Sequence, residues 1–168
     1  MGETIERIFE YRLLYAKQRE LQIPLSADEQ RRLGELRSQL PNHVPTLDER
    51  DALTLLRFPL PVQYVAGGRF GSGVLRNGSA QGLAVETVED PPALGQRLIV
   101  HVQESAHGLE YTFPCRVIAR VVKGVPSMGV VFEGVPAETR AVARTSGVFR
   151  PDPGFQEEEL ETTKVSRF

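Results

Sequence analysis

The side chains most able to do chemistry in this chain are three histidines and a single cysteine. His43, His101 and His107 fall in an expected linker, strand and turn, and none stands at a paired metal-ligand spacing with cysteine. Because Cys115 is the only cysteine, no internal disulfide can form, and its apolar neighbours predict a buried, inert thiol. We therefore expect neither a metal site nor catalytic residues.

Two glycine-rich stretches could hold a phosphate or a nucleotide. The first, GGRFGSG at residues 67–73, precedes an expected strand instead of opening a helix, so no helix N-terminus is there to hold a phosphate. We predict a hairpin turn there. Neither a Gly-Lys-Ser phosphate loop nor a hydrolase serine elbow occurs. The chain is therefore not expected to be an enzyme or to need a cofactor.

The second stretch, NGSAQG at residues 77–82, pairs chemically with Arg57, which stands just ahead of the first expected strand. A guanidinium can donate two hydrogen bonds to the edge of a guanine, stack on its plane, or pair with a phosphate. Asn77 and Ser79 would offer an amide and a hydroxyl at the sheet surface, and Gly82 would let a ligand approach closely. Together these residues could form half of a guanine-nucleotide site.

Structural roles for the same residues remain open. Asn-Gly is itself a strong hairpin signal, and Ser79 can bond the backbone of its own turn. Arg57 can equally serve as a solvated arm residue or as an ion-pair partner.

Helical patterns occupy the N-terminal quarter of the chain. Residues 3–21 place apolar side chains on one broad helical face, namely Ile5, Ile8, Phe9, Tyr15 and Ala16. Pro24 ends this helix, and SADEQ then supplies a capping box between Ser26 and Glu29. Leucines at helical spacing follow until Pro41, namely Leu33, Leu36 and Leu40. The pattern predicts a helical hairpin.

The remainder of the chain is rich in short β-type runs separated by turn residues. These runs cover residues 62–65, 73–75, 82–85, 98–102, 113–122 and 129–132. Strands at this spacing without intervening helices predict a mainly β fold, a small antiparallel barrel or sandwich. Residues 136–147 read as one short helix after the barrel, with proline near its start and glycine after its end. The expected domains are a helical hairpin at 1–45, a linker arm at 46–57, the barrel with its helix at 58–148 and a flexible acidic tail at 149–168.

Composition limits the classes of partner. With a formal net charge of −2 and a pI near 6.0, the chain is not expected to bind DNA or anionic membranes nonspecifically. It has no apolar run long enough for a membrane span, and its N-terminus lacks the apolar core of a signal peptide. A cytoplasmic location is the expectation.

With these features the sequence resembles the PilZ domain, the bacterial receptor module for the second messenger cyclic di-GMP. That family carries an Arg-x-x-x-Arg arm, a strand, and then Asp/Asn-x-Ser-x-x-Gly; NGSAQG matches through Asn77, Ser79 and Gly82, and Arg57 takes the place of the second arm arginine. Later segments agree in order, namely PPALGQRLIVHV, CRVIARVV and MGVVFEGV. The resemblance covers about residues 53–147 and implies a PilZ-like β-barrel.

The arm departs from the family pattern, because Leu53 stands where the first arginine belongs. Arg50, Arg69 or Arg76 could supply a compensating guanidinium.

Two functions follow from these features. The first is a cyclic di-GMP receptor acting in motility, type IV pili, exopolysaccharide or biofilm control, with binding weakened by Leu53. The second is a ligand-independent adaptor that binds a protein partner, or a second copy of itself, through the helices at residues 3–40.

Overall fold

A computed structural model describes residues 2–43, 47, 60–104 and 107–140. Helices α1 (Gly2–Arg19) and α2 (Ala27–Gln39) come first, and the strands follow. These are β1 (Leu60–Ala66), β2 (Arg69–Gly78), β3 (Gly82–Thr87), β4 (Arg97–Glu104), β5 (Leu109–Val121), β6 (Ser127–Phe132) and β7 (Ala137–Arg140). The predicted helical hairpin and all six predicted strand regions are present.

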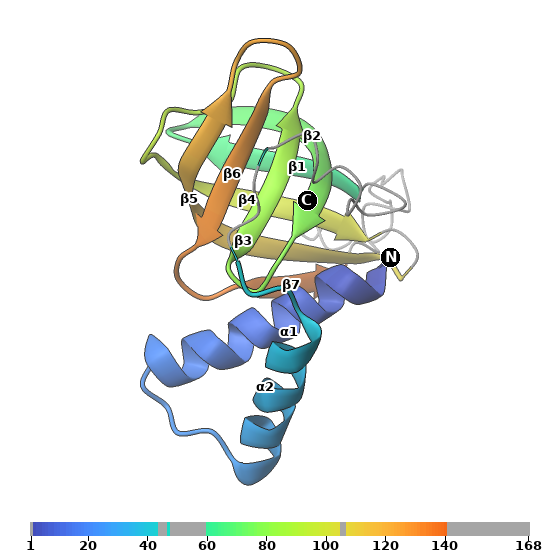
Figure 1. Cartoon of the computed structure of the whole chain (residues 1–168), viewed down its shortest axis with the longest axis vertical. Coiled ribbons are helices and arrows are strands. Elements are labelled where there is room, and N and C mark those ends of the chain that lie inside the picture. Colours follow the sequence, from blue (N-terminus) through green and yellow to red (C-terminus); the bar gives the residue numbers. More distant parts are fainter. Residues whose placement is uncertain (1, 44–46, 48–59, 105–106, 141–168) are drawn as a thin grey trace, which may run out of the picture.

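The strands form a closed antiparallel barrel (Figure 1). Neighbouring strands follow the order β4-β1-β2-β3-β6-β5, and a further pairing between β4 and β5 closes the ring. In β1, the even-numbered residues from Leu60 to Ala66 are buried, whereas Pro61 and Gln63 are exposed. This period of two is what a strand needs when one face fills a barrel and the other faces solvent.

The connection from β1 to β2 confirms the hairpin predicted for the first glycine-rich stretch. Gly67 and Gly68 have φ angles of 57° and 80°. Two successive residues with positive φ match the twist of flanking antiparallel strands, and glycine adopts this conformation without strain.

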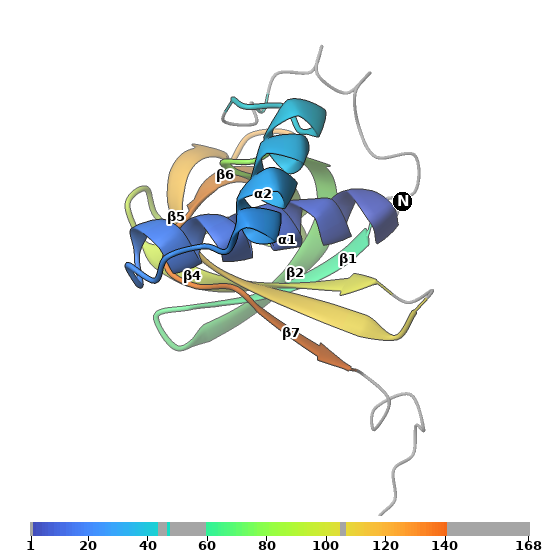
Figure 2. The same ribbon diagram turned by 90° about the horizontal axis from the view of Figure 1, so that it is seen from below.

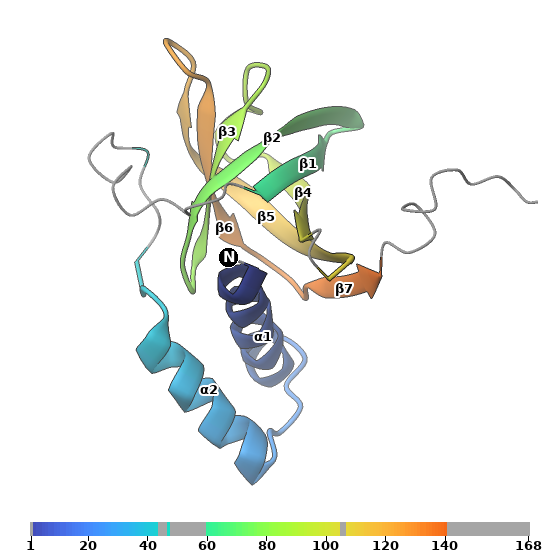
Figure 3. The same cartoon turned by 90° about the vertical axis from the view of Figure 1, so that its right-hand side faces the viewer.

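Helix α1 lies across the lower end of the barrel, and α2 packs on the side of α1 that faces away from it (Figures 2 and 3). The ring of Phe9 lies 5.1 Å from that of Tyr111 and 6.4 Å from that of Phe113, both on β5. Arg12, only 7% exposed, donates to the Gly134 carbonyl at 3.0 Å and pairs with Glu20. The helix is thus part of the barrel's core.

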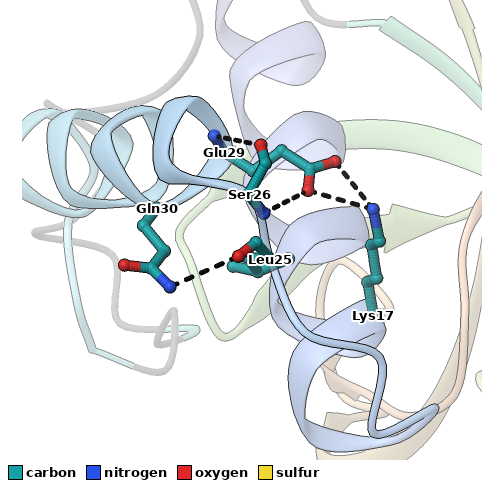
Figure 4. Close-up of polar contacts among 5 residues, drawn as sticks. All are labelled: Lys17, Leu25, Ser26, Glu29 and Gln30. Carbon is teal, nitrogen blue, oxygen red and sulfur yellow. Dashed lines mark hydrogen bonds and ion pairs between the residues drawn. The ribbon is translucent and has the colours of Figure 1, made fainter.

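The capping box predicted for α2 is present and also joins the two helices (Figure 4). The Glu29 amide donates to the Ser26 hydroxyl at 3.1 Å, and the Glu29 carboxylate accepts from the Ser26 amide at 2.9 Å. Lys17 of α1 donates to the same carboxylate at 2.8 and 3.0 Å. This Lys17 hydrogen bond is the main reason why the pKa of Glu29 lies below its ordinary value.

The helix predicted for residues 136–147 is wrong at its start, because Ala137–Arg140 form β7. Strand β6 pairs with β5 only from Cys115 onward, so Leu109–Thr112 would otherwise have an open edge, and β7 pairs with it. Main-chain bonds to that edge outweigh the helix propensity of the short segment. Residues 141–147 and the predicted tail at 149–168 lie outside the described residues.

Candidate functional site

The structure describes the turn half of the candidate site but not the arm half. Asn77, Ser79, Gly82 and Arg76 are described, whereas Arg57, Arg50 and Leu53 lie outside the described residues. The turn joins β2 to β3 at the end of the barrel near α1.

The tip of the hairpin falls three residues later than the Asn-Gly signal suggests. Asn77 and Gly78 still belong to β2, paired with Ala84 and Leu83. The Ser79 amide donates to the Gly82 carbonyl at 3.0 Å, so Ala80 and Gln81 form the tip. Asn77 uses its side-chain oxygen to accept the Gly78 amide at 2.8 Å. A bulge between Leu75 and Asn77 shifts the register just before this point.

The expectation that Ser79 is presented at the surface is wrong. The residue is 1% exposed, and its hydroxyl accepts the Gln81 amide at 3.1 Å, the local bond that a serine makes in a turn. Asn77 is half-buried. Side chains and backbone of the helical hairpin pack on this turn, which no local sequence signal indicates.

Two of these packing contacts come from segments distant in sequence. A Cβ added to Gly78 would lie 2.8 Å from Cδ1 of Ile8, so the absence of a side chain lets α1 approach β2. The Ala80 amide donates to the Pro41 carbonyl at 2.9 Å, just after α2 ends. The turn is therefore held between the barrel and the helical hairpin.

Gly82 has a structural reason to be glycine. A Cβ at this position would run into the Val130 carbonyl oxygen on β6, and a backbone atom cannot move aside cheaply. The sequence suggested that Gly82 lets a ligand approach closely, but in the structure it is the backbone of β6 that approaches this glycine.

The two described arginines on β2 differ in their distance from the turn. Arg76 sits beside Asn77, is about one third exposed, and its Nε lies 3.7 Å from a Glu86 carboxylate oxygen. Arg69 begins β2, and at ~3.3 Å per residue its backbone is on the order of 25 Å from Asn77. Of this pair only Arg76 can reach a ligand at the turn.

Of the four side chains singled out in the sequence for their chemistry, His43 is exposed, and the other three have structural surroundings. His101 hydrogen-bonds Thr112 at 3.0 Å, and His107 contacts the buried Glu104 carboxylate at 3.0 Å. Cys115 is 1% exposed, as predicted, and burial raises the pKa of its thiol well above the ordinary value. Within residues 2–43, 47, 60–104 and 107–140, no group of three potential metal-ligating side chains gathers.

Comparison with known proteins adds one finding. The family model described as PilZ domain matches residues 47–145, a range that includes the seven strands of the described residues and begins after α2. No curated protein matches the chain. Among the described helices, neither is long and apolar enough to cross a membrane.

Proposed function

The chain belongs to the PilZ domain family, and we propose that it binds cyclic di-GMP at the Asn77–Gly82 turn, together with Arg57 from the arm. PilZ domains are non-catalytic receptor modules for this messenger. The proposed processes are those of the family: motility, type IV pili, exopolysaccharide production and biofilm formation.

The observation that carries this proposal is the turn itself. Asn77, Ser79 and Gly82 keep the family spacing at the junction of β2 and β3, on a closed barrel. Asn77 is partly accessible, and Arg76 adds a positive charge beside it. A partly accessible amide next to a guanidinium suits an anionic nucleotide with a guanine edge.

Leu53 sets the proposed strength of binding. A charge-assisted or bidentate contact to a base is worth about 1–3 kcal/mol. Losing one such contact weakens binding about 5- to 150-fold, at roughly 1.4 kcal/mol per decade. We therefore propose a receptor of reduced affinity instead of one with no affinity.

Isothermal titration calorimetry with cyclic di-GMP tests the proposal. Leu53→Arg should tighten binding about 5- to 150-fold, the range that one contact supplies. Arg57→Ala should weaken binding by a further factor of about 5 to 150, because it removes the other arm guanidinium. Arg69→Ala is the matched control, because it removes an exposed arginine at the far end of β2 and should change nothing. If neither the natural chain nor Leu53→Arg gives a binding heat, the receptor function is wrong.

A second candidate function rests on the helices, which lie outside the matched region. Leu21 and Ile23, in the connection between α1 and α2, are 51% and 45% exposed. We propose, as the alternative, an adaptor that binds a protein partner or a second copy through residues 3–40. The double variant Leu21→Ser, Ile23→Ser would then lose oligomer formation or partner capture while its far-UV spectrum stays unchanged. Retention of both would dismiss the adaptor.

A further inference from the structure

The segment that leaves α2 is bound to the candidate turn. We call Leu40–Asn42 the strap. The Ala80 amide donates to the Pro41 carbonyl at 2.9 Å, and the Gln81 side-chain amide lies 3.3 and 3.4 Å from the two oxygens of Asn42. Figure 3 shows this segment rising from α2 beside the barrel. The strap thus contacts the tip of the turn that carries the family motif.

The strap is also continuous with the end of the helix. The Leu40 amide donates to the Leu36 carbonyl at 3.1 Å, and the Leu40 side chain is 8% exposed. Any movement of Pro41 away from the turn therefore pulls on the last turn of α2.

The turn is closed in this arrangement. Ser79 is 1% exposed and already uses its hydroxyl within the turn, and Gly78 is covered by Ile8. A ligand that hydrogen-bonds the Ser79 hydroxyl has to uncover it first. The contacts most readily given up are those of the strap, because Gln81 and Asn42 are exposed and only one of the three bonds joins two backbone groups.

We propose that the strap and cyclic di-GMP compete for the Asn77–Gly82 turn, so that binding of the dinucleotide detaches the strap and loosens the C-terminal end of α2. This inference rests on the proposed receptor function. In this proposal, ligand binding at the turn changes the structure of α2, which lies outside the matched region. The helical hairpin would then transmit the signal.

A crosslink tests the competition. In Asn42→Cys, Gln81→Cys the two thiols replace exposed side chains that touch. A short bifunctional maleimide can join them, and Cys115 is spared because it is buried and its pKa is raised. Locking the strap removes the binding-competent state, so affinity for cyclic di-GMP should fall by more than about tenfold.

Two controls separate the causes. The same variant capped with N-ethylmaleimide carries the modification without the link and should bind at least as tightly as the natural chain. Lys17→Cys, Glu29→Cys, joined by the same reagent, ties α1 to α2 but leaves the strap free, and should bind normally. Hydrogen exchange should also show the Leu40 and Ala80 amides losing protection when ligand is added to the natural chain.

The outcomes are distinct. Equal affinity of the linked and capped forms, or unchanged protection of both amides at saturation, overturns the competition and leaves the receptor standing. Absence of binding in the natural chain, in the capped form and in Leu53→Arg overturns the receptor and the competition together.

Discussion

Replacing Phe9 by alanine should destabilise the whole barrel and not the helix alone. The ring is 8% exposed and contacts Tyr111 and Phe113, which are 1% and 0% exposed on β5. If α1 is part of the core, the cavity left by the ring lies where helix and barrel meet. The cavity then destabilises the helix and the barrel together.

The size of the effect follows from the burial. Phe→Ala in a core costs about 3–5 kcal/mol, which includes the cavity and the two aromatic pairs. Domains of this size are stable by only about 5–15 kcal/mol, so the variant loses a large share of its stability. Leu13→Ala is the matched control on the same helix, because Leu13 is 37% exposed and its loss should cost less than about 1 kcal/mol.

Urea unfolding followed by far-UV and near-UV circular dichroism measures both variants, with tyrosine as the near-UV probe since the chain has no tryptophan. We expect one transition, shifted to lower denaturant in Phe9→Ala by several times the shift in Leu13→Ala. If the two variants unfold alike, or if the helical signal is lost in a separate early transition while the barrel signal persists, α1 is an appendage and the reasoning fails.

Three further predictions concern single positions. Gly82→Ala should cost about 1–3 kcal/mol in urea unfolding, because the new Cβ meets the Val130 carbonyl; a neutral effect would contradict this close approach of β6 to Gly82. Gln22→Gly should leave stability equal or raise it by up to about 1 kcal/mol, since Gln22 is the one described non-glycine residue with positive φ, at 55°; a clear loss would show that its side chain matters. Burial raises the pKa of Tyr111 to about 12, so its contribution to stability should be fully present below pH ~10 and should decline as the pH rises towards 12. The phenolate absorbance of Tyr111 should appear only when the protein unfolds. Titration of all four tyrosines near pH ~10 in the folded protein would contradict this prediction.

The elements that sequence predicts well here are those fixed by local chemistry. The capping box of Ser26 and Glu29 spans three residues, and both of its bonds are made within that span. The Gly67–Gly68 turn likewise depends on two adjacent residues. Strand β7 could not be predicted in this way, because Ala137–Arg140 extend only in response to the open edge of β5. That edge exists because β6 stops pairing at Cys115, a tertiary fact.

The candidate site also combines a feature that adjacent residues determine with one that depends on tertiary contacts. The spacing of Asn77, Ser79 and Gly82 predicts a turn at the right place in the chain, since β2 and β3 meet there. The burial of Ser79 is different. It accompanies contacts from Pro41 and Asn42, and the bonds to Asn42 join residues 39 positions apart. Nothing in the composition of the strap marks it as a partner of this turn.

The residues of the motif can serve the fold, a ligand, or both, and the structure shows a role in the fold for three of them. Ser79 closes its own loop, Gly78 admits Ile8, and Gly82 admits the backbone of β6, so each is needed by the fold whether or not a nucleotide binds. A mutation at any of them would impair binding through the barrel, and such a loss would say little about recognition. Discrimination between a receptor and an adaptor therefore has to come from position 53 and from the strap. Leu53→Arg and the 42–81 crosslink act on affinity from opposite directions, and they alter none of these three residues.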